Sequence, residues 1–433
     1  MGPPRCPGRL RRPGGRTAPL QPRCPRTLAA HLRGGPGRDR EHRRVRWRRL
    51  RTRGSRRGRD TRVSADLPPL SAAGRVARFR EALAVHGIEH GIVSGASTRR
   101  WLSGFTGSNG DVVVTPDRVV LVTDGRYGSQ AERQISASGA GVDEVMVTTT
   151  VVEQRRRVDE LCAGAGRVGF ESMVWSHAEW SAHGALDDLV PIDSVVSQLR
   201  RRKDAAEIAR ITEAARIASV ALAAVEIAPG VSERDIRDSL ESTMRAHGAD
   251  GPSYETIVAS GPDNAAMAHH RPSRRVLEVG DTVVIDVGAL LDGYHSDMTR
   301  SFVVGDPSDE QQRWYAALSR AQRAGLDAVA DGVATREVDA ACRASLAEEG
   351  LADLFTHGTG HGVGLDIHEE PFLGRSTESV LAAGDVVTVE PGLYRVGAGG
   401  MRIEDLVLVT ESGHRSLTDF PKDDPCPPSP PTT

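Results

Sequence analysis

Residues 282–302 read TVVIDVGALLDGYHSDMTRSF. Asp286 lies in an almost continuous apolar run, typical of a buried strand, and Asp297 follows eleven residues later. The intervening Asp292-Gly293 is a strong signal for a two-residue hairpin turn. Such a turn makes the flanking strands antiparallel neighbours and brings the two carboxylates close, about one diagonal step apart. Because buried carboxylates repel each other, a shared cation would stabilise this pair. The alternative is a capping Asp and a hairpin Asp with no joint role.

A second signal is the glycine-rich segment HGTGHGVGLDIHE, which begins at His357. His357 and His361 have the spacing of a metal-binding pair on a helix. However, four alternating glycines disfavour a helix by about 1 kcal/mol each relative to Ala. The segment is therefore predicted to be a loop or strand whose backbone leaves room for a ligand. Three histidines within twelve residues, ending at His368, indicate a functional site rather than a structural histidine.

The remaining acids of interest are Glu390, in VVTVEPG, and Glu404, in MRIEDLVLV. Each ends or interrupts an apolar strand, and a glycine-rich loop joins the two strands. An isolated Glu in such a strand would ordinarily be an exposed edge residue. With Asp286, Asp297 and His361, however, they form a set of four carboxylates and one imidazole without a matching run of Lys or Arg. Because unpaired buried charge is costly, the set predicts two divalent cations with a bridging hydroxide.

Charge is divided unevenly along the 433 residues. Residues 1–62 hold 21 Arg and only three acids, whereas the remaining 371 residues hold 35 of the 56 basic and 55 of the 58 acidic residues. The basic head has three interpretations: a disordered arm that binds nucleic acid, a solvated tail without a role, or upstream DNA translated from a start codon set too early. The third fits the abrupt compositional change near Val63 and is favoured. Residues 1–65 are therefore interpreted as a disordered extension outside the fold.

Other features exclude whole classes of protein. The five Cys have no spacing typical of a zinc site or a disulfide framework, which favours a reducing cytoplasm. No apolar stretch reaches about 18 residues, so no membrane span is predicted. Arg11-Arg12 is not followed by the apolar region of a secretion signal.

The pattern of apolar residues divides the rest of the chain into two kinds of structure. Up to residue 200, short strands alternate with helices, as in a small α/β domain. After a charged joint, Ser232 and Asp235 form a predicted capping box for a helix over residues 233–246. The other expected helices are 75–86, 127–136, 152–162, 205–226, 308–325 and 335–349, and the clearest strands of the first domain are 112–115, 119–123, 144–149 and 167–170. The Pro-rich residues 421–433 are predicted to be disordered.

Together these residues resemble the pita-bread metallopeptidase family, which includes methionine aminopeptidase, aminopeptidase P and prolidase. The resemblance covers about residues 70–415 and rests on the order Asp, Asp, His, Glu, Glu. In addition, WLSGFTGSNG from Trp101 and VTDGRY from Val122 resemble the creatinase-type N-terminal domain of bacterial Xaa-Pro peptidases. The implied fold class is α+β, with a smaller α/β creatinase-like domain (66–200) before a catalytic pita-bread domain (201–420). Methionine aminopeptidase lacks the first domain, and creatinase lacks the metal ligands.

The resemblance also implies a role for each site residue. The implied metal ligands are Asp286, Asp297, His361, Glu390 and Glu404, of which Asp297 and Glu404 bridge both ions. Catalytic roles are implied for His269, His357, His368, Glu390 and Arg402, and substrate contacts for His269, His357, His368 and Tyr394. Relatives often carry Pro at the position of Ala268, which leaves the choice between His269 and its neighbour His270 open.

The implied reaction is hydrolysis of N-terminal Xaa-Pro bonds by the bridging hydroxide, with Glu390 as the general base. Oxygen-rich ligands favour two Mn²⁺ ions, with Co²⁺ or Zn²⁺ as alternatives. The substrate would be a peptide with proline at its second position. Xaa-Pro aminopeptidase is favoured over Xaa-Pro dipeptidase (prolidase), and a non-catalytic peptide-binding relative is the remote alternative. A cytoplasmic homodimer without membrane or nucleic-acid partners is expected.

Overall fold

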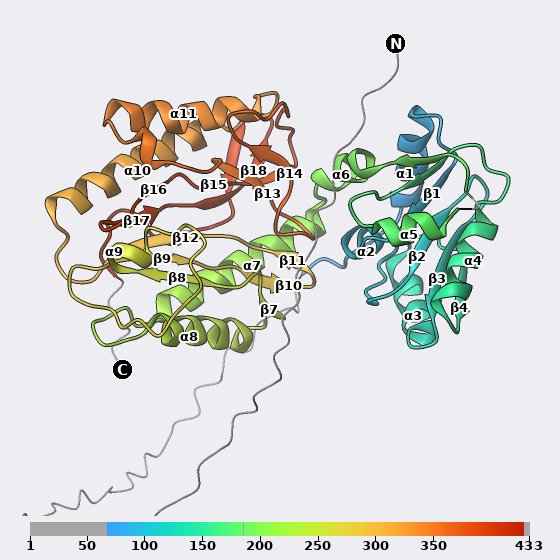
Figure 1. Cartoon of the computed structure of the whole chain (residues 1–433), viewed down its shortest axis with the longest axis horizontal. Coiled ribbons are helices and arrows are strands. Elements are labelled where there is room, and N and C mark those ends of the chain that lie inside the picture. The colour runs from blue at the N-terminus through green and yellow to red at the C-terminus, as the bar shows by residue number, and fades with distance from the viewer. Residues whose placement is uncertain (1–66, 185, 428–433) are drawn as a thin grey trace, which may run out of the picture. The chain divides into compact units, whose positions relative to one another are not determined.

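The computed structural model describes residues 67–184 and 186–427 (Figure 1). The predictions for the Arg-rich head and for the last six residues lie outside the described residues. In the part of the chain that the structure describes, no helix has the length and apolarity needed to cross a bilayer.

The described part of the N-terminal domain is built on a six-stranded mixed sheet in the order β4-β3-β2-β1-β5-β6. Its strands are β1 (His90–Val93), β2 (Asp111–Val114), β3 (Val119–Asp124), β4 (Glu144–Thr148), β5 (Val168–Phe170) and β6 (Leu189–Pro191). Its helices are α1 (Arg75–Val85), α2 (Ala96–Ser103), α3 (Gly128–Ser138), α4 (Val151–Leu161), α5 (His177–Ala182) and α6 (Asp193–Arg201). Every strand predicted from the apolar runs of this region is present. The sequence analysis missed β1, β6, α2, α5 and α6, because short apolar runs and short helices carry little periodicity.

The catalytic domain begins with helices that cover one set of strands (Figure 1). The elements are α7 (Ala205–Ala224), α8 (Glu233–Ala246), β7 (Gly251–Pro252), β8 (Ile257–Ser260), α9 (Gly261–Asn264), β9 (Thr282–Asp286), β10 (Ala289–Leu291), β11 (Tyr294–His295) and β12 (Thr299–Val303). Apolar side chains of α7 and α8 share one core with those of β8, β9 and β12. The capping box predicted at Ser232 and Asp235 is confirmed at the start of α8.

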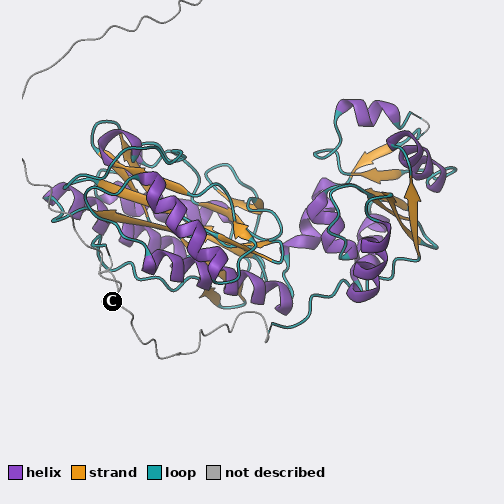
Figure 2. Cartoon of the chain, turned by 90° about the horizontal axis from the view of Figure 1, so that it is seen from below, coloured by secondary structure: helices purple, strands orange, loops and turns teal. Residues whose placement is uncertain are grey.

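A second group of elements completes the catalytic domain. They are α10 (Asp309–Asp327), α11 (Thr335–Glu348), the 3₁₀ turn η1 (Ala352–Leu354), β13 (Gly360–Gly362), β14 (Glu369–Leu373), β15 (Val386–Val389), β16 (Gly392–Arg395), β17 (Gly399–Arg402), β18 (Asp405–Thr410) and β19 (Gly413–Ser416). Helices α10 and α11 share a core with β15, β16, β17 and β18. Both domains therefore mix helices and strands, as Figure 2 shows.

The register of β9 against β12 fixes the relative positions of Asp286 and Asp297. Asp286 lies directly opposite Thr299, so Asp297 lies two residues before the start of β12, at the diagonal position expected from the sequence. The predicted turn is also present: Asp292 and Gly293 have φ angles of 48° and 73° between β10 and β11. These positive values are what a two-residue hairpin turn requires.

Part of the segment predicted to be disordered contacts the catalytic domain. The Val303 amide donates to the carbonyl of Pro425 at 2.7 Å. The Lys422 ammonium pairs with buried Asp405, which Arg300 also contacts at 2.8 Å. Because a buried carboxylate needs charged or hydrogen-bonding partners, this interaction holds residues 421–425 against the core.

Candidate metal centre

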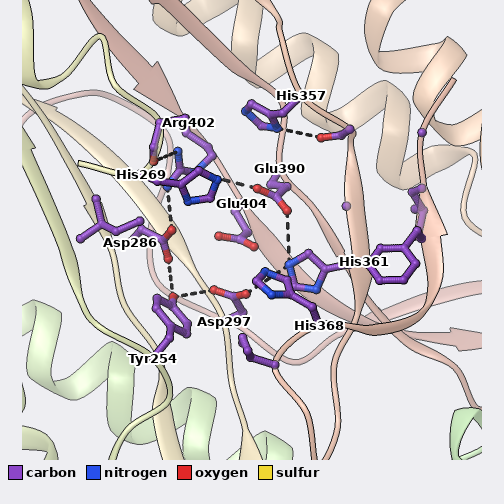
Figure 3. Close-up of a pocket in the computed structure, with 18 of the residues that line it drawn as sticks. Tyr254, His269, Asp286, Asp297, His357, His361, His368, Glu390, Arg402 and Glu404 are labelled. Atoms are coloured by element: carbon purple, nitrogen blue, oxygen red, sulfur yellow. Dashed lines mark hydrogen bonds and ion pairs between the residues drawn. The ribbon is translucent and has the colours of Figure 1, made fainter. Parts of the chain in front are cut away.

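All five residues predicted to bind metal line a single cavity of about 540 Å³ (Figure 3). They come from separate segments of the catalytic domain, so only the folded chain brings them together. They are Asp286 at the end of β9, Asp297 before β12, His361 in β13, Glu390 after β15 and Glu404 before β18.

The two aspartates share a hydrogen-bond donor. The Tyr254 hydroxyl donates to Asp297 at 2.6 Å and also contacts Asp286. Burial raises the pKa of Asp297 well above its usual value, and the nearby Asp286 and Glu390 carboxylates raise it further. Burial likewise raises the pKa of Tyr254, and the Asp286 and Asp297 carboxylates raise it further, because ionising the phenol beside two negative charges is unfavourable. Tyr254 therefore remains a neutral donor to both acids.

His361 lies in β13 between Gly360 and Gly362, and neither of these two positions has room for a side chain. A Cβ on Gly360 would collide with the Thr388 carbonyl, and one on Gly362 would collide with the Glu370 carbonyl. The Nδ1 atom of His361 lies 3.0 Å from the Gly362 carbonyl oxygen, and as the donor there it leaves Nε2 free to act as a ligand. Burial, followed by the proximity of His368, lowers the pKa of His361 to about 4. The imidazole is thus neutral at pH 7, the form that binds metals.

The two glutamates complete the ring of acids around the cavity. Glu390 Oε1 lies 3.5 Å from His361 Nε2, and burial raises its pKa to about 8. Glu404 is 1% exposed and accepts a 2.7 Å hydrogen bond from Thr299. Burial raises the pKa of Glu404 well above its usual value, with Asp297 adding to the effect.

This donor set fits divalent cations. One ligand atom from each of Asp297, His361 and Glu404 lies within 4.8 Å of the others. Burial is the main cause of the raised pKa values of Asp297, Glu390 and Glu404, and the neighbouring carboxylates add to it. Oxygen atoms and a neutral imidazole are ligands for Mn²⁺, Co²⁺ and Zn²⁺. The set can therefore hold metal ions, and their number and identity are considered below.

Arg402 connects the acids to the opposite wall of the cavity. Its guanidinium contacts Asp286 at 2.7 Å and donates to the Tyr394 hydroxyl at 2.7 Å. That hydroxyl lies 3.0 Å from Nε2 of His357. Burial, followed by the nearby Arg402, lowers the pKa of His357 to about 4. The predicted residues Arg402, Tyr394 and His357 thus form one hydrogen-bonded chain along this wall.

The other two predicted histidines face the open cavity. His269 and His368 are both exposed and both line the cavity. The His368 ring packs edge-on against His361 with 4.3 Å between centroids. Burial and the nearby His269 lower the pKa of His368. His270 instead contacts Glu233 at 2.9 Å, so the structure assigns the cavity position to His269.

The sequence analysis gave no role to Tyr254 or Thr299, although Thr299 lies in the segment singled out for the two aspartates. Thr299 donates to Glu404 and also accepts a 3.0 Å hydrogen bond from Arg402. Its position opposite Asp286 in the strand register is the signal that could have identified it. Tyr254 carries no such signal, because its contact with the acids depends on how β8 and β9 pair.

Two family profiles match this chain. Residues 75–202 match the creatinase/prolidase N-terminal domain, and residues 209–411 match metallopeptidase family M24. Among curated proteins, the peptidase YqhT of Bacillus subtilis, named as uncharacterized, is 36% identical over 357 residues, which cover 81% of this chain and 99% of that protein. The Xaa-Pro dipeptidase of Pyrococcus furiosus is 43% identical over 229 residues, which cover 52% of this chain and 66% of that enzyme.

Solved structures give the same fold. The Xaa-Pro dipeptidase from Bacillus anthracis is 38% identical with a TM-score of 0.76, covering 82% of this chain and 99% of that one. The X-Pro aminopeptidase from Thermotoga maritima is 32% identical with a TM-score of 0.72, covering 80% and 98%. These matches confirm the predicted fold class, with a creatinase-like domain before a pita-bread domain. The chain therefore belongs to metallopeptidase family M24.

Proposed function

We propose that this metallo-exopeptidase hydrolyses the bond between the first residue of a peptide and a proline at the second position. The supporting observation is the convergence of four carboxylates and a neutral imidazole on one cavity in a chain of family M24. Two divalent cations would offset the charge of the acids, and the oxygen-rich set favours Mn²⁺, with Co²⁺ or Zn²⁺ as alternatives. When bound, such ions supply the Lewis acidity that polarises a carbonyl and lowers the pKa of water.

Glu390 is the proposed proton carrier. The nitrogen of a peptide-bonded proline has no N–H, so it must gain a proton before it can leave. Glu390 is placed to accept a proton from the attacking water and to deliver it to that nitrogen. Its backbone amide is held by the Thr359 carbonyl at 2.8 Å, which fixes the carboxylate on the cavity wall.

His269 and His368 are the proposed donors to the substrate carbonyl oxygen. Both point into the cavity, and the lowered pKa of His368 keeps it neutral at pH 7, with one N–H available. Donors placed where negative charge develops stabilise the transition state of acyl transfer.

The chain of His357, Tyr394 and Arg402 is proposed to form the proline subsite. Tyr394 and Arg402 are 9% and 2% exposed, and each side chain has a hydrogen-bonding neighbour that fixes its rotamer. These fixed side chains form a rigid surface that suits the proline ring of the substrate, which has a fixed shape. Arg402 also orients Asp286, so substitutions here are expected to affect both the acids and the substrate.

Both arginines that line the cavity already have partners, and this favours substrates longer than a dipeptide. A dipeptidase must bind a free carboxylate beside the proline ring. Four of the five N–H groups of Arg402 are already used by Thr299, Tyr394, Ala268 and Asp286. Arg271, the other arginine among the lining residues, pairs with Glu255 at 2.9 Å. We therefore propose Xaa-Pro aminopeptidase activity, with Xaa-Pro dipeptidase as the second candidate, which the names of several relatives favour.

A three-substrate assay tests the proposal. Manganese-loaded protein is given an Xaa-Pro dipeptide, an Xaa-Pro-Yaa-Zaa tetrapeptide and a matched Xaa-Ala-Yaa-Zaa tetrapeptide. Cleavage of the Xaa-Pro tetrapeptide but not the alanine peptide supports an aminopeptidase. Cleavage of the dipeptide alone identifies a dipeptidase, and Arg271→Ala should then raise KM for it. If fully metallated protein cleaves none of them, the proposed function is wrong and a peptide-binding role becomes the better explanation.

The homodimer, the cytoplasmic location and the domain boundaries at 66–200 and 201–420 are proposals, as are the assignments of individual site residues. The proposed boundary at residue 200 falls in the last turn of α6, which ends at Arg201.

A further inference from the structure

Glu233 is a buried carboxylate outside the cavity that the proposed reaction does not use. It is the first residue of α8 and is 0% exposed. Helix capping does not explain its burial, because Ser232 and Asp235 already form the capping box of α8. A buried carboxylate must be fully hydrogen-bonded to be tolerated, so its partners indicate its role.

The partners of Glu233 all lie in one segment, residues 260–273. The Oε1 atom faces the Ser260 amide, the Ser260 hydroxyl and the Asn264 side chain at 2.8, 2.7 and 3.0 Å. The Oε2 atom faces His270 Nε2, the Ser273 amide and the Ser273 hydroxyl at 2.9, 2.8 and 2.6 Å. Burial opposes ionisation, but these hydrogen bonds outweigh it and lower the pKa of Glu233 to about 2. The carboxylate is therefore charged and fastens both ends of the segment.

His269 lies within this segment and depends on its backbone for its position. In the described part of the chain, its imidazole has no side-chain hydrogen bond. Its neighbours are held instead: the Ala268 carbonyl accepts a 3.2 Å hydrogen bond from Arg402, and the His270 ring contacts Glu233. The two fixed neighbours determine where His269 enters the cavity.

We propose that Glu233 is a positioning residue that places His269 in the cavity by anchoring residues 260–273. This inference rests on the proposed function only for the role of His269, since the anchoring itself is independent of activity. Glu233 touches neither the cavity nor the predicted metal ligands. Weakening the anchor should therefore displace His269 and leave the metal site intact.

A double-mutant cycle on the manganese-loaded enzyme tests the coupling. Glu233→Gln keeps the shape of the side chain but turns one acceptor oxygen into an amide that faces donors. We expect kcat and kcat/KM to fall together, by up to about 100-fold, the effect of a 1 Å misplacement. Metal stoichiometry should not change. In a His269→Ala background, the same substitution should cost less than about 3-fold, because the residue that it positions is already gone. Equal losses in both backgrounds would overturn the proposal.

Hydrogen exchange of the metal-loaded full chain provides a readout that does not require activity. Glu233→Gln should speed exchange in residues 261–272 while β9 and β15 stay protected. Unchanged exchange in this segment, or a uniform increase across the domain, would contradict local anchoring. If the wild-type enzyme proves inactive on every proline peptide, the proposed function fails while this measurement still decides the anchoring.

Two further variants distinguish the loss of local anchoring from a general loss of folding. His270→Ala removes one link and leaves the other partners of Glu233, so it should give a smaller loss of kcat in the same direction. Glu207→Gln is the matched control: Glu207 is also a buried glutamate in the first turn of a helix, and it accepts hydrogen bonds from Asp204 and Tyr294. It should leave kcat and exchange of residues 261–272 unchanged. A loss of kcat in Glu207→Gln that matches Glu233→Gln would overturn the proposal.

Discussion

The Thr299 hydroxyl in β12 donates a 2.7 Å hydrogen bond to Glu404, which lies 105 residues further along the chain, just before β18. The same oxygen accepts a 3.0 Å hydrogen bond from Arg402 Nε, and the Glu404 amide donates to the Thr299 carbonyl at 3.1 Å. A single threonine thus sets the position of an acid and of the arginine beside it. Thr299 also pairs with Asp286 in the sheet. This one residue therefore helps to position Asp286, Arg402 and Glu404.

Thr299→Val should weaken metal binding while preserving the fold. Valine keeps the branched shape in β12 but leaves Glu404 without a donor and Arg402 without an acceptor. Loss of such outer hydrogen bonds typically costs about 10- to 100-fold in metal affinity or activity. Manganese titration of the metal-free protein measures the effect. Thr123→Val, at a buried threonine in the other domain, is the control, and an unchanged affinity in Thr299→Val would refute the role.

Tyr254→Phe should shift metal binding to higher pH. The hydroxyl hydrogen bond lowers the pKa of Asp297, so removing it makes the carboxylate harder to ionise. Since metals compete with protons for these oxygens, affinity should fall more at pH 6 than at pH 8. Cobalt titrations followed by absorbance at both pH values give the comparison. Tyr294→Phe, at another buried tyrosine that donates to a glutamate, should show no such pH dependence.

The metal-free protein should lose stability between pH 6.5 and 8. Burial raises the pKa of Glu390 to about 8, so in this window the folded state binds more protons than the unfolded state. Stability therefore decreases as pH rises through the folded-state pKa. His357 and His361 have folded-state pKa values of about 4 but an ordinary pKa of about 6.5 when unfolded, so they offset part of this decrease at the lower end of the window. A Tm lower at pH 8 by more than about 3 °C, roughly 1 kcal/mol for a domain of this size, is expected.

Two controls make the pH measurement specific. Adding manganese should raise Tm more at pH 8 than at pH 6.5, because binding to the folded state favours the ionised acids. Glu390→Gln should flatten the pH dependence of the metal-free protein. A Tm that rises with pH over the same window would contradict the assigned direction of the pKa shift.

His368→Ala should separate metal binding from turnover. The ring packs against His361 but supplies none of the predicted ligands, so both ions should stay bound. Loss of one donor to the developing oxyanion costs about 100- to 1000-fold in kcat. Metal analysis alongside steady-state kinetics checks both points, with His247→Ala at the end of α8 as the control. Wild-type turnover would make His368 a structural residue.

Glu404→Ala should abolish activity and reduce metal content together. A carboxylate predicted to bridge two ions has no substitute among its neighbours, so the loss should exceed the roughly 100-fold upper value for outer hydrogen bonds. Glu310→Ala, at an exposed glutamate paired with Arg395, should behave as wild type. Retention of two metal ions by Glu404→Ala would contradict the bridging role.

Sequence reasoning succeeded where a local pattern carries the geometry. The Asp292-Gly293 turn fixes the register, and the register places Asp286 and Asp297 together. Contacts that depend on how distant segments pack could not be predicted in this way. The link from Glu233 to His270, and the one from Tyr254 to the aspartates, join residues with no shared periodicity. The choice between His269 and His270 was open for the same reason, since adjacent side chains are separated only by tertiary structure.

The backbone around His361 limits how this enzyme can be redesigned. Because main-chain oxygens of Thr388 and Glu370 occupy the space beside Gly360 and Gly362, the floor of the cavity cannot be reshaped by mutation there. Libraries aimed at new substrate preferences should instead vary the rim, where Phe372 is 42% exposed and Arg271 is open to solvent. Changes in substrate preference are therefore expected to come from residues at the rim of the cavity.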